Sequence, residues 1–365
     1  ALTRRAFLKR TALAAGALSV APYNLLHARS AGDKIRCVQI GCGGRGMSHL
    51  SATLNEHLVA IADVDESRHA AVFKWFQDKQ CDAAHVQVFT DYRRVFDKLK
   101  KDFDAVFIAT PNHQHAVPAL LAMQLGKHVY CEKPVCHSVG EARAMRARAA
   151  KSKVATQMGN QGHCEEGYRR LCEYIWSGAI GRITETHSWT NRANGGEGPR
   201  PPREAVPAGL HWDEWIGPAP YRDFHSDLHP HSWHGWYDFG NGSIGNMGCH
   251  VLDGVYWALK VEHPTSIEVE AMRGGSDERY PMGSRVRWDV PARGDLPPLR
   301  VYWYEGLNQT TTGRPEGRLR QVRGDNRNLP ELLIQLRAQY PDEELDRSDS
   351  GTLYVGEKGA IYTAT

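Results

Sequence analysis

The sequence predicts an α/β protein of two domains, a doubly wound parallel sheet over residues 31–157 and a second α/β domain over residues 158–365. Two observations predict this organisation. Up to about residue 160, short apolar runs alternate with amphipathic stretches, which is typical of parallel strands joined by helices. Beyond that point the alternation fades and longer β-rich runs begin, and 365 residues suffice for two cores.

In the first domain, the strands are expected as short runs rich in Val, Ile and Ala. The expected strands cover 34–40, 57–63, 103–110, 127–134 and 153–160. One helix is expected to begin at Gly46, and three others to cover 67–80, 115–126 and 138–152. Right-handed crossovers place the carboxyl ends of these strands on one rim of the sheet, where ligands bind. We therefore expect five loops to face one cleft: "GCGGRG", "ADVD", "ATPNHQH", "CEKP" and "MGNQGH".

The first of these loops carries the pattern G-x-G-x-x-G at Gly41, Gly43 and Gly46, between a strand and a helix. The first glycine allows a tight turn, the second lets a pyrophosphate approach the backbone, and the third lets helix and strand pack closely. The N-terminus of the helix offers free N–H groups to phosphates. We therefore expect a dinucleotide to bind here, in contact also with Gly44 and Arg45.

An acidic residue, Asp63, ends the second strand about 20 residues beyond Gly41, a spacing at which a carboxylate accepts hydrogen bonds from the ribose diol. A carboxylate there repels the 2′-phosphate of NADP. The sequence therefore favours NAD, and the nearby Arg68 leaves NADP open. The alternative interpretation of Asp63 is a helix N-cap, because a helical stretch follows it.

The other loops on the same rim supply further candidate cofactor contacts. Their side chains follow the carboxyl ends of parallel strands, so they are expected to face the cleft. These candidates are Thr110, Pro111, Asn112, His115, Glu132, Lys133 and Asn160.

Composition excludes several classes of function. A net charge of +3 is too small to indicate a nucleic-acid partner. No stretch beyond residue 30 approaches the ~20 apolar residues of a membrane span. None of the eight cysteines stands in a C-x-x-C pair, so we expect buried free thiols rather than a disulfide framework or a zinc site. The cysteines are Cys37, Cys42, Cys81, Cys131, Cys136, Cys164, Cys172 and Cys249.

The first thirty residues are interpreted as a targeting segment and set apart from the fold. "TRRAFLK" at residues 3–9 resembles the twin-arginine export signal, and an apolar run and small residues near "HARSA" follow it. The resemblance implies export of a folded protein, with its cofactor already inside, to the periplasm. A basic amphipathic helix is the alternative. The sequence leaves open whether the segment is cleaved, for which the best position is after Ser30.

Short motifs along the chain resemble the Gfo/Idh/MocA (glucose–fructose oxidoreductase / inositol dehydrogenase) family: "ATPNHQHA", "CEKPVCHS", "QMGNQGH", "WSGAIGRITETHSWTNR", "GSIGNMGCHVLDGVYWAL" and "GEKGAIY". The resemblance implies a Rossmann domain and a C-terminal α/β domain on an open, mostly antiparallel sheet, whose outer face makes homodimers or homotetramers. The β-rich runs at 182–192, 265–274, 284–290 and 298–306 agree with such a sheet. Relative to the family the chain stops early, after "GEKGAIYTAT", which leaves open whether a final segment is missing.

The same resemblance implies that Lys133 is the catalytic or substrate-orienting residue. An ammonium at that rim can orient a hydroxyl and lower its pKa. His250 is the candidate general acid/base, on a helix expected over about 244–259. Asn246 and Asp253 lie on the same face of that helix, where Asp253 could orient the imidazole or pair elsewhere.

At Asn246 the sequence departs from the family, which has Asp at this position. Asn can hydrogen-bond a sugar hydroxyl but cannot accept a proton. Three interpretations stay open: His250 acts as the base with help from Lys133, a different acid substitutes, or the enzyme is impaired or differently specialised. We favour the first.

The stretch 211–240 is dense in Trp, His, Tyr, Pro and Asp and has little regular periodicity. Aromatic faces stack on sugar rings, and Asp and His bind hydroxyls, so we expect this loop to face a carbohydrate over a packed aromatic base. The spacing of "HPHSWH" at 229–234 is not a standard ligand spacing, and no metal is expected. The candidate substrate contacts are His163, Trp236, Tyr237, Asp238 and Asp253.

These features predict an NAD(P)-dependent oxidoreductase that acts on a hydroxyl of a small carbohydrate by hydride transfer. Export with a bound cofactor implies recycling in place, because no pool of NAD exists outside the cytoplasm. Two alternatives stay open: an NAD-dependent redox-neutral glycosidase, which the family also contains, and a non-catalytic protein that holds the nucleotide.

Overall fold

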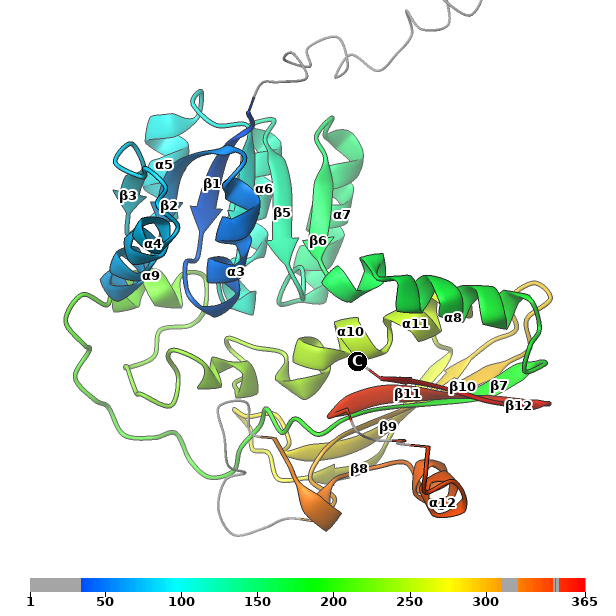
Figure 1. The fold of residues 1–365 in the computed structure, drawn as a ribbon. Helices are drawn as coiled ribbons and strands as arrows, with labels where there is room; N and C mark the ends of the chain where they lie inside the picture. The colour runs from blue at the N-terminus through cyan, green and yellow to red at the C-terminus, as the bar shows by residue number, and fades with distance from the viewer. Residues whose placement is uncertain (1–33, 310–320, 344, 346–347, 365) are drawn as a thin grey trace, which may run out of the picture.

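The computed structural model describes residues 34–309, 321–343, 345 and 348–364. The segment that resembles an export signal, residues 1–30, lies outside them. Two sheets form the described part of the molecule, one in the N-terminal half of the chain and one in the C-terminal half (Figure 1). No helix in these described ranges has the length and apolar character needed to span a membrane.

The described N-terminal half forms a six-stranded parallel sheet in the order β3-β2-β1-β4-β5-β6, which is the doubly wound order. Its strands are β1 (Arg36–Ile40), β2 (His57–Ala62), β3 (Gln87–Phe89), β4 (Ala105–Ile108), β5 (His128–Glu132) and β6 (Thr156–Gly159). Its helices are α3 (Gly44–Thr53), α4 (Glu66–Asp78), α5 (Tyr92–Leu99), α6 (Ala116–Gln124) and α7 (Val139–Lys151). The predicted fold class is confirmed here.

Burial on both faces explains why the central strands are mostly apolar. Val38 and Ile40 of β1 belong to one core cluster, and Cys37 of the same strand belongs to the cluster on the opposite face. A sheet covered by helices on both faces buries every position of its central strands. The short β3 and the helix α5 were missed in the sequence, and α3 begins at Gly44 rather than at Gly46.

The second sheet has the order β12-β11-β7-β10-β9-β8, and among these described strands only β7 and β10 pair in parallel. The expectation of a mostly antiparallel sheet is therefore confirmed. Its strands are β7 (Ile183–Thr190), β8 (Ser266–Arg273), β9 (Gly283–Val290), β10 (Leu299–Gly306), β11 (Ser350–Gly356) and β12 (Gly359–Ala364).

Helices between the two sheets carry the second half of the site. In Figure 1, α8 (Glu166–Trp176), α10 (Cys249–Val251) and α11 (Asp253–Ala258) lie between the parallel sheet and the second sheet. Their apolar faces pack on Val301, Trp303 and Tyr354 of that sheet. Leu333 of α12 (Glu331–Gln339) packs with Trp189 and Tyr304 of β7 and β10 in a separate cluster.

The single helix expected over 244–259 is divided. A π-helical turn, η4 (Ile244–Gly248), precedes α10 and α11. Gly245, Gly248 and Gly254 weaken an α-helix by roughly 0.5–1 kcal/mol each relative to Ala. Gly254 also needs the absence of a side chain, because a Cβ there would lie 2.6 Å from the hydroxyl of Tyr354.

A long irregular stretch joins the two domains a second time. Residues 207–234, here called the crossing segment, run from the second domain across to the parallel sheet, where α9 (Trp212–Ile216) lies beside α4 (Figure 1). The remaining short helices are η1 (Asn112–Gln114), η2 (Gln161–Cys164), η3 (Ser232–Gly235) and η5 (Gly324–Asn326).

Candidate active site

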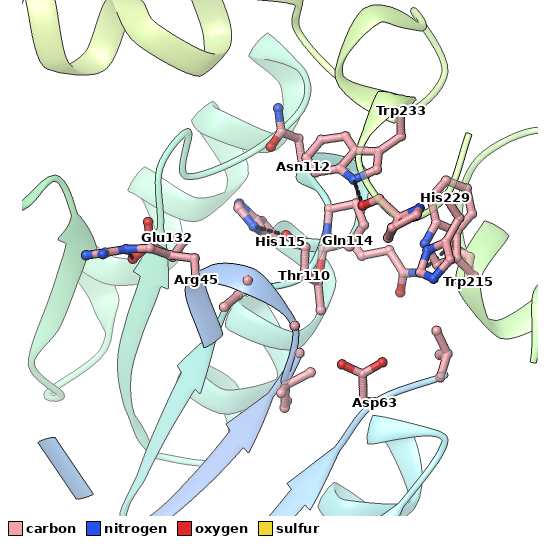
Figure 2. A pocket seen from close by; sticks show the side chains of 18 of the residues that line it. Arg45, Asp63, Thr110, Asn112, Gln114, His115, Glu132, Trp215, His229 and Trp233 are labelled. Carbon is pink, nitrogen blue, oxygen red and sulfur yellow. Dashed lines mark hydrogen bonds and ion pairs between the residues drawn. The ribbon is translucent and has the colours of Figure 1, made fainter. Parts of the chain in front are cut away.

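A cleft with about 350 Å³ of space opens at the carboxyl ends of β1, β2, β4 and β5. The glycine loop, Asp63, the loop after β4 and Lys133 form one side of it. Figure 2 shows Asp63 on this side, with Trp215, His229 and Trp233 of the crossing segment on another. Four of the five loops that were expected to converge line this cleft; the loop "MGNQGH" does not.

The glycine loop has the geometry that its pattern requires. Gly41 has a φ of +82°, and a Cβ there would lie 2.6 Å from the carbonyl carbon of Ala109. A Cβ on Gly46 would lie 2.0 Å from the carbonyl oxygen of Gly41, so α3 can approach β1 only through a glycine. At Gly43 the nearest atom would be 3.7 Å away, which leaves the backbone open toward the cleft.

Asp63 follows β2 directly, and main-chain donors hold its carboxylate. Its Oδ2 accepts from the N–H of Cys42 at 2.6 Å, and its Oδ1 accepts from the N–H of Asp65 at 2.9 Å. Burial raises the pKa of Asp63. The N-cap of α4 is Asp65, which accepts from the N–H of Ser67, so the alternative of a capping role for Asp63 is wrong.

Two predicted cofactor contacts, His115 and Asn112, line the cleft and also hold loops in place. His115 is buried, with Nδ1 2.6 Å from the carbonyl oxygen of Pro134 and Nε2 2.7 Å from that of Thr110. It therefore joins the loop after β4 to the loop after β5. Asn112 is buried as well and donates from Nδ2 to Asn241 at 3.0 Å. Pro111 and Thr110 line the cleft.

Glu132 and Asn160 lie at the ends of neighbouring strands. The buried Glu132 accepts from His49 Nε2 at 2.9 Å and from Arg45 Nε at 3.1 Å. Although burial opposes ionisation, these partners lower the pKa of Glu132. Asn160 donates to the carbonyl oxygen of Cys249 at 2.8 Å, while its Oδ1 is buried with no partner among the described residues.

Lys133 connects the two domains at the cleft. Its Nζ donates to the main-chain oxygen of Asn246 at 2.6 Å and to the side-chain Oδ1 of Asn246 at 2.9 Å. Burial lowers the pKa of Lys133 to about 8. An ammonium held this way is fixed in direction and able to exchange a proton near neutral pH.

His250 stands four residues beyond Asn246, in α10. Burial and the positive charge of Lys133 lower the pKa of His250 to about 4, and the charge of Arg192 acts in the same direction. The ring is therefore neutral at pH 7 and has a nitrogen that can accept a proton. Asp253 does not orient this ring, because its carboxylate pairs with His163 Nδ1 at 2.9 Å.

None of the five predicted substrate contacts lines the cleft. Trp236 is fully buried and therefore cannot stack on a sugar; the guanidinium groups of Arg222 and Arg279 lie 4.7 Å and 4.4 Å from its ring centroid. Asp238 accepts from Arg222 at 2.6 Å, and Tyr237 packs on Tyr280. Irregular loops give no periodicity from which an inward face could have been predicted.

The remaining two substrate contacts form a pair of their own. His163 stacks on Trp257 with ring centroids 4.2 Å apart and pairs with Asp253. The ring of His163 is nearly half exposed. Both residues lie outside the cleft lining, on η2 and α11.

The crossing segment does face the cleft, as the aromatic and histidine-rich composition predicted, but through other residues. Those that line the cleft are Trp215, His229, Pro230, His231, Trp233 and His234. The signal in the sequence was the density of aromatic residues and histidines, which indicates a loop near a ligand without saying which side chains point inward.

The described residues contain no candidate metal-binding group, and their cysteines are free. No group of three His, Cys, Asp or Glu side chains within the described ranges could hold a metal ion. All eight cysteines lie in those ranges and are free; Cys164 is exposed, and Cys81, Cys136 and Cys249 are only partly buried. The expectation of buried thiols therefore holds for Cys37, Cys42, Cys131 and Cys172.

The residues of the cleft fit a dinucleotide. The backbone at Gly43 is open where a pyrophosphate would approach, and the carboxylate of Asp63 stands where a ribose diol would donate. One buried acceptor atom of a cleft-lining residue has no partner in the described structure, His229 Nδ1, which leaves a hydrogen bond for a ligand to make.

Two models of one protein family match this chain, one in each half. Residues 35–160 match the model of an oxidoreductase family with an NAD-binding Rossmann fold, and residues 180–282 match that family's C-terminal α/β domain.

Two curated relatives are similar over part of the chain. Inositol 2-dehydrogenase of Salmonella typhimurium is 29% identical over 153 residues, which cover 40% of this chain and 43% of the relative. Levoglucosan dehydrogenase of Pseudarthrobacter phenanthrenivorans is 40% identical over 100 residues, which cover 26% of this chain and 24% of the relative. The matched parts thus span less than half the length of either relative.

Two solved structures share the fold. The scyllo-inositol dehydrogenase of Lactobacillus casei with bound NAD(H) and scyllo-inositol has a TM-score of 0.53 at 16% identity, covering 91% of this chain and 77% of that one. The WlbA dehydrogenase of Bordetella pertussis, in complex with NADH and UDP-GlcNAcA, has a TM-score of 0.57 at 17% identity, covering 90% and 77%.

Proposed function

The chain belongs to the Gfo/Idh/MocA oxidoreductase family and has its NAD-binding domain, and from that premise we propose that it oxidises a hydroxyl of a sugar or sugar derivative by hydride transfer. The single observation that carries the proposal is the hydrogen-bonded pair of Lys133 and Asn246 at the rim of the dinucleotide cleft, with His250 four residues beyond Asn246.

At neutral pH these residues hold complementary protonation states. Lys133 is mostly protonated, and its Nζ–H groups can orient the substrate hydroxyl and stabilise the oxygen as it loses its proton. His250 is neutral and accepts that proton. Asn246 takes no proton; it fixes Lys133 through two oxygens. This division favours the interpretation in which His250 is the base and Lys133 assists.

The residues that would bind the cofactor line the same cleft. The N–H groups and open backbone of the glycine loop would hold the pyrophosphate, and Asp63 would accept from the ribose of the adenosine half. When bound, NAD supplies the acceptor for the hydride that leaves the hydroxyl-bearing carbon. The carboxylate of Asp63 favours NAD over NADP.

The proposal includes a nucleotide that stays bound through successive turnovers, with the same site reducing a carbonyl compound between two oxidations. The crossing segment supports retention, because it lies over the cleft. Export by the twin-arginine route belongs to the same proposal. It rests on residues 3–9, and a retained nucleotide would suit a protein that leaves the cytoplasm folded.

We extend the proposal to a homodimer or homotetramer formed through the second sheet. Its edge strand β8 exposes more than 60% of Ile267, Val269 and Met272. Three large apolar side chains on one edge strand are a surface that soluble proteins normally cover.

The first test is to purify the full chain from cytoplasm, denature it and identify the released nucleotide by mass spectrometry. The holoprotein is then mixed with a panel of sugars while the nicotinamide absorbance is followed. We expect Lys133→Met and His250→Ala to lower turnover about 10²–10⁴-fold with the nucleotide still bound. Lys74→Met, on the exposed face of α4, is the control and should be fully active.

Other outcomes select other functions. Bound nucleotide whose absorbance never responds to any sugar would indicate a protein that only holds it. Release of a free sugar from a glycoside without net change in absorbance would indicate the redox-neutral glycosidase. Unchanged turnover in His250→Ala would remove His250 from the mechanism.

A further inference from the structure

The crossing segment is tied to the loop that carries Asp63. The N–H of His211 donates to the carbonyl oxygen of Val64 at 2.9 Å, and the N–H of Glu66 donates to that of Gly209 at 2.9 Å. These two backbone bonds pair the crossing segment with the loop after β2 as a short antiparallel bridge between Asp65 and Leu210. The adenosine half of a nucleotide bound in the cleft would therefore contact residues from both domains.

A second attachment lies on the loop after β4. The carbonyl oxygen of Trp215 is 2.9 Å from His113 Nε2, and Gln114 Nε2 donates to the carbonyl oxygen of Glu214 at 2.9 Å. His113 and Gln114 are buried under α9. The crossing segment is thus attached to two of the loops that bind a dinucleotide in this fold.

His229 is where the segment reaches the cleft itself (Figure 2). Its Nε2 lies 3.3 Å from Asp65 Oδ2, and its ring packs edge-on against Trp215, with centroids 5.9 Å apart. Although burial opposes ionisation of Asp65, hydrogen bonds from Ser67 and His229 lower the pKa of that carboxyl. The hydrogen of the neutral ring is therefore assigned to Nε2.

The other ring nitrogen is left without a partner. His229 Nδ1 is buried and makes no hydrogen bond to any described residue. With the hydrogen on Nε2, Nδ1 is an acceptor, and burial lowers the pKa of His229, which keeps it so at neutral pH. A buried acceptor calls for a donor. On the adenosine side the available donors are ribose hydroxyls and the adenine amino group, whereas a phosphate oxygen cannot donate.

We propose that the crossing segment is part of the cofactor site: His229 Nδ1 accepts a hydrogen bond from the adenosine half of the nucleotide, and the contact of Nε2 with Asp65 holds the ring in place for that bond. The inference rests on the proposed function only in that the chain binds NAD. It gives the histidine-rich loop a nucleotide as its ligand, in place of the carbohydrate expected from the sequence.

The test measures how fast NADH leaves. Protein loaded with NADH is mixed with excess NAD, and the loss of bound NADH fluorescence is followed by stopped flow. His229→Leu should release NADH about tenfold or more faster, since a buried hydrogen bond to the ligand is lost. Asp65→Ser keeps a capping hydroxyl for α4 and removes the carboxylate, and it should also speed release. His225→Leu is the control, because His225 pairs with Glu204 and does not line the cleft.

Two further results keep the inference separate from a loss of structure. His229→Asn has an oxygen that can accept in place of Nδ1, and it should return the release rate toward that of the unmodified protein. Release within twofold of the unmodified rate in His229→Leu would overturn the inference, even if the enzyme oxidises a sugar. A chain that never holds NADH would instead contradict the proposed function.

Discussion

The ammonium of Lys133, at the end of β5, donates to both oxygens of Asn246, at 2.6 Å to the main chain and 2.9 Å to the side chain. One residue of the second domain thereby fixes the direction of a lysine in the first. Because the amide is neutral, it leaves the pKa of Lys133 at about 8, as burial sets it. Asn246 in place of the family's Asp therefore removes a negative charge from beside Lys133.

Restoring the acid should move the pH dependence of the reaction. In Asn246→Asp, a carboxylate would stand beside the ammonium and raise the pKa of Lys133 by about 1–3 units. The alkaline limb of kcat/KM should then move to higher pH, and the acid limb should move the same way by less, because the new carboxylate offsets the charge of Lys133 that lowers the pKa of His250. The measurement is a pH profile of kcat/KM for both proteins. An unmoved alkaline limb would show that Lys133 does not set it.

The unmodified enzyme should have a broad pH optimum between two limbs. His250 is neutral above its pKa of about 4, and Lys133 is protonated below its pKa of about 8. Both required forms coexist between these values, so kcat/KM should fall below the first and above the second. Arg192 lowers the pKa of both residues, and Arg192→Gln should therefore shift both limbs upward. A shift of one limb alone would contradict this electrostatic account.

Asp63 should decide the choice of nucleotide. Asp63→Asn removes the charged acceptor for the ribose diol, and hydrogen bonds to charged groups contribute about 1.5–3 kcal/mol. We expect the Kd for NAD to rise about 10–100-fold and the preference over NADP to shrink. Titration calorimetry with the nucleotide-free protein measures both. Asp78→Asn, at the exposed end of α4, is the matched control and should bind NAD normally.

Two glycines at the starts of helices should respond to alanine in opposite ways. Gly46→Ala would place a Cβ 2.0 Å from the carbonyl oxygen of Gly41, so we expect a large loss of stability and of NAD binding. At Gly167, in the first turn of α8, a Cβ would have no other described residue within 4 Å, and Gly167→Ala should stabilise by about 0.5 kcal/mol. Thermal melting of both variants distinguishes local packing from a general intolerance of alanine.

Glu305 should make the second domain less stable as the pH rises. This carboxyl is buried under η4, where it accepts from Trp303 Nε1 at 2.9 Å, and burial raises its pKa to about 7 from an ordinary value of 4.5. In the unfolded chain it ionises first. The contribution of Glu305 to the free energy of unfolding is therefore largest below pH 4.5 and is lost as the pH rises through about 7.

The full contribution of that shift is about 3 kcal/mol. Glu305→Gln removes it, so the variant should be the more stable protein at pH 8 and lose its advantage near pH 4. Urea unfolding at the two pH values measures the difference. A variant that is less stable at pH 8 would mean that the ionised carboxylate is itself stabilising.

Most of the parallel sheet could be predicted because its central strands are buried on both faces. The run of β4 is apolar throughout, those of β1 and β5 are mostly apolar, and glycine or proline follows each of them closely. The three-residue β3 is too short for such a signal. The helix α5 did carry one, since Asp91 caps it and Val95, Phe96 and Leu99 share its buried face.

The site residues could be predicted where a position requires one residue type. They could not be predicted where the role depends on the direction in which a side chain points. Gly41, Gly46 and Asp63 have the places that their spacing required. Trp236 and Asp238 lie in the same aromatic-rich loop as Trp233 and His229, and the sequence does not distinguish the two pairs. Only Trp233 and His229 line the cleft. In an irregular loop, the direction of a side chain depends on tertiary partners such as Arg222, which no local pattern reveals.

The position of the crossing segment along the chain also sets an order of events during synthesis. A ribosome completes the last strand of the parallel sheet at Gly159, well before it reaches residue 207. A nascent chain thus offers Asp63 and the glycine loop to nucleotides in the surrounding cytosol while nothing yet lies over them. We expect loading to accompany translation, so that starving cells of NAD during expression would leave an empty protein that later addition of NAD fills only slowly.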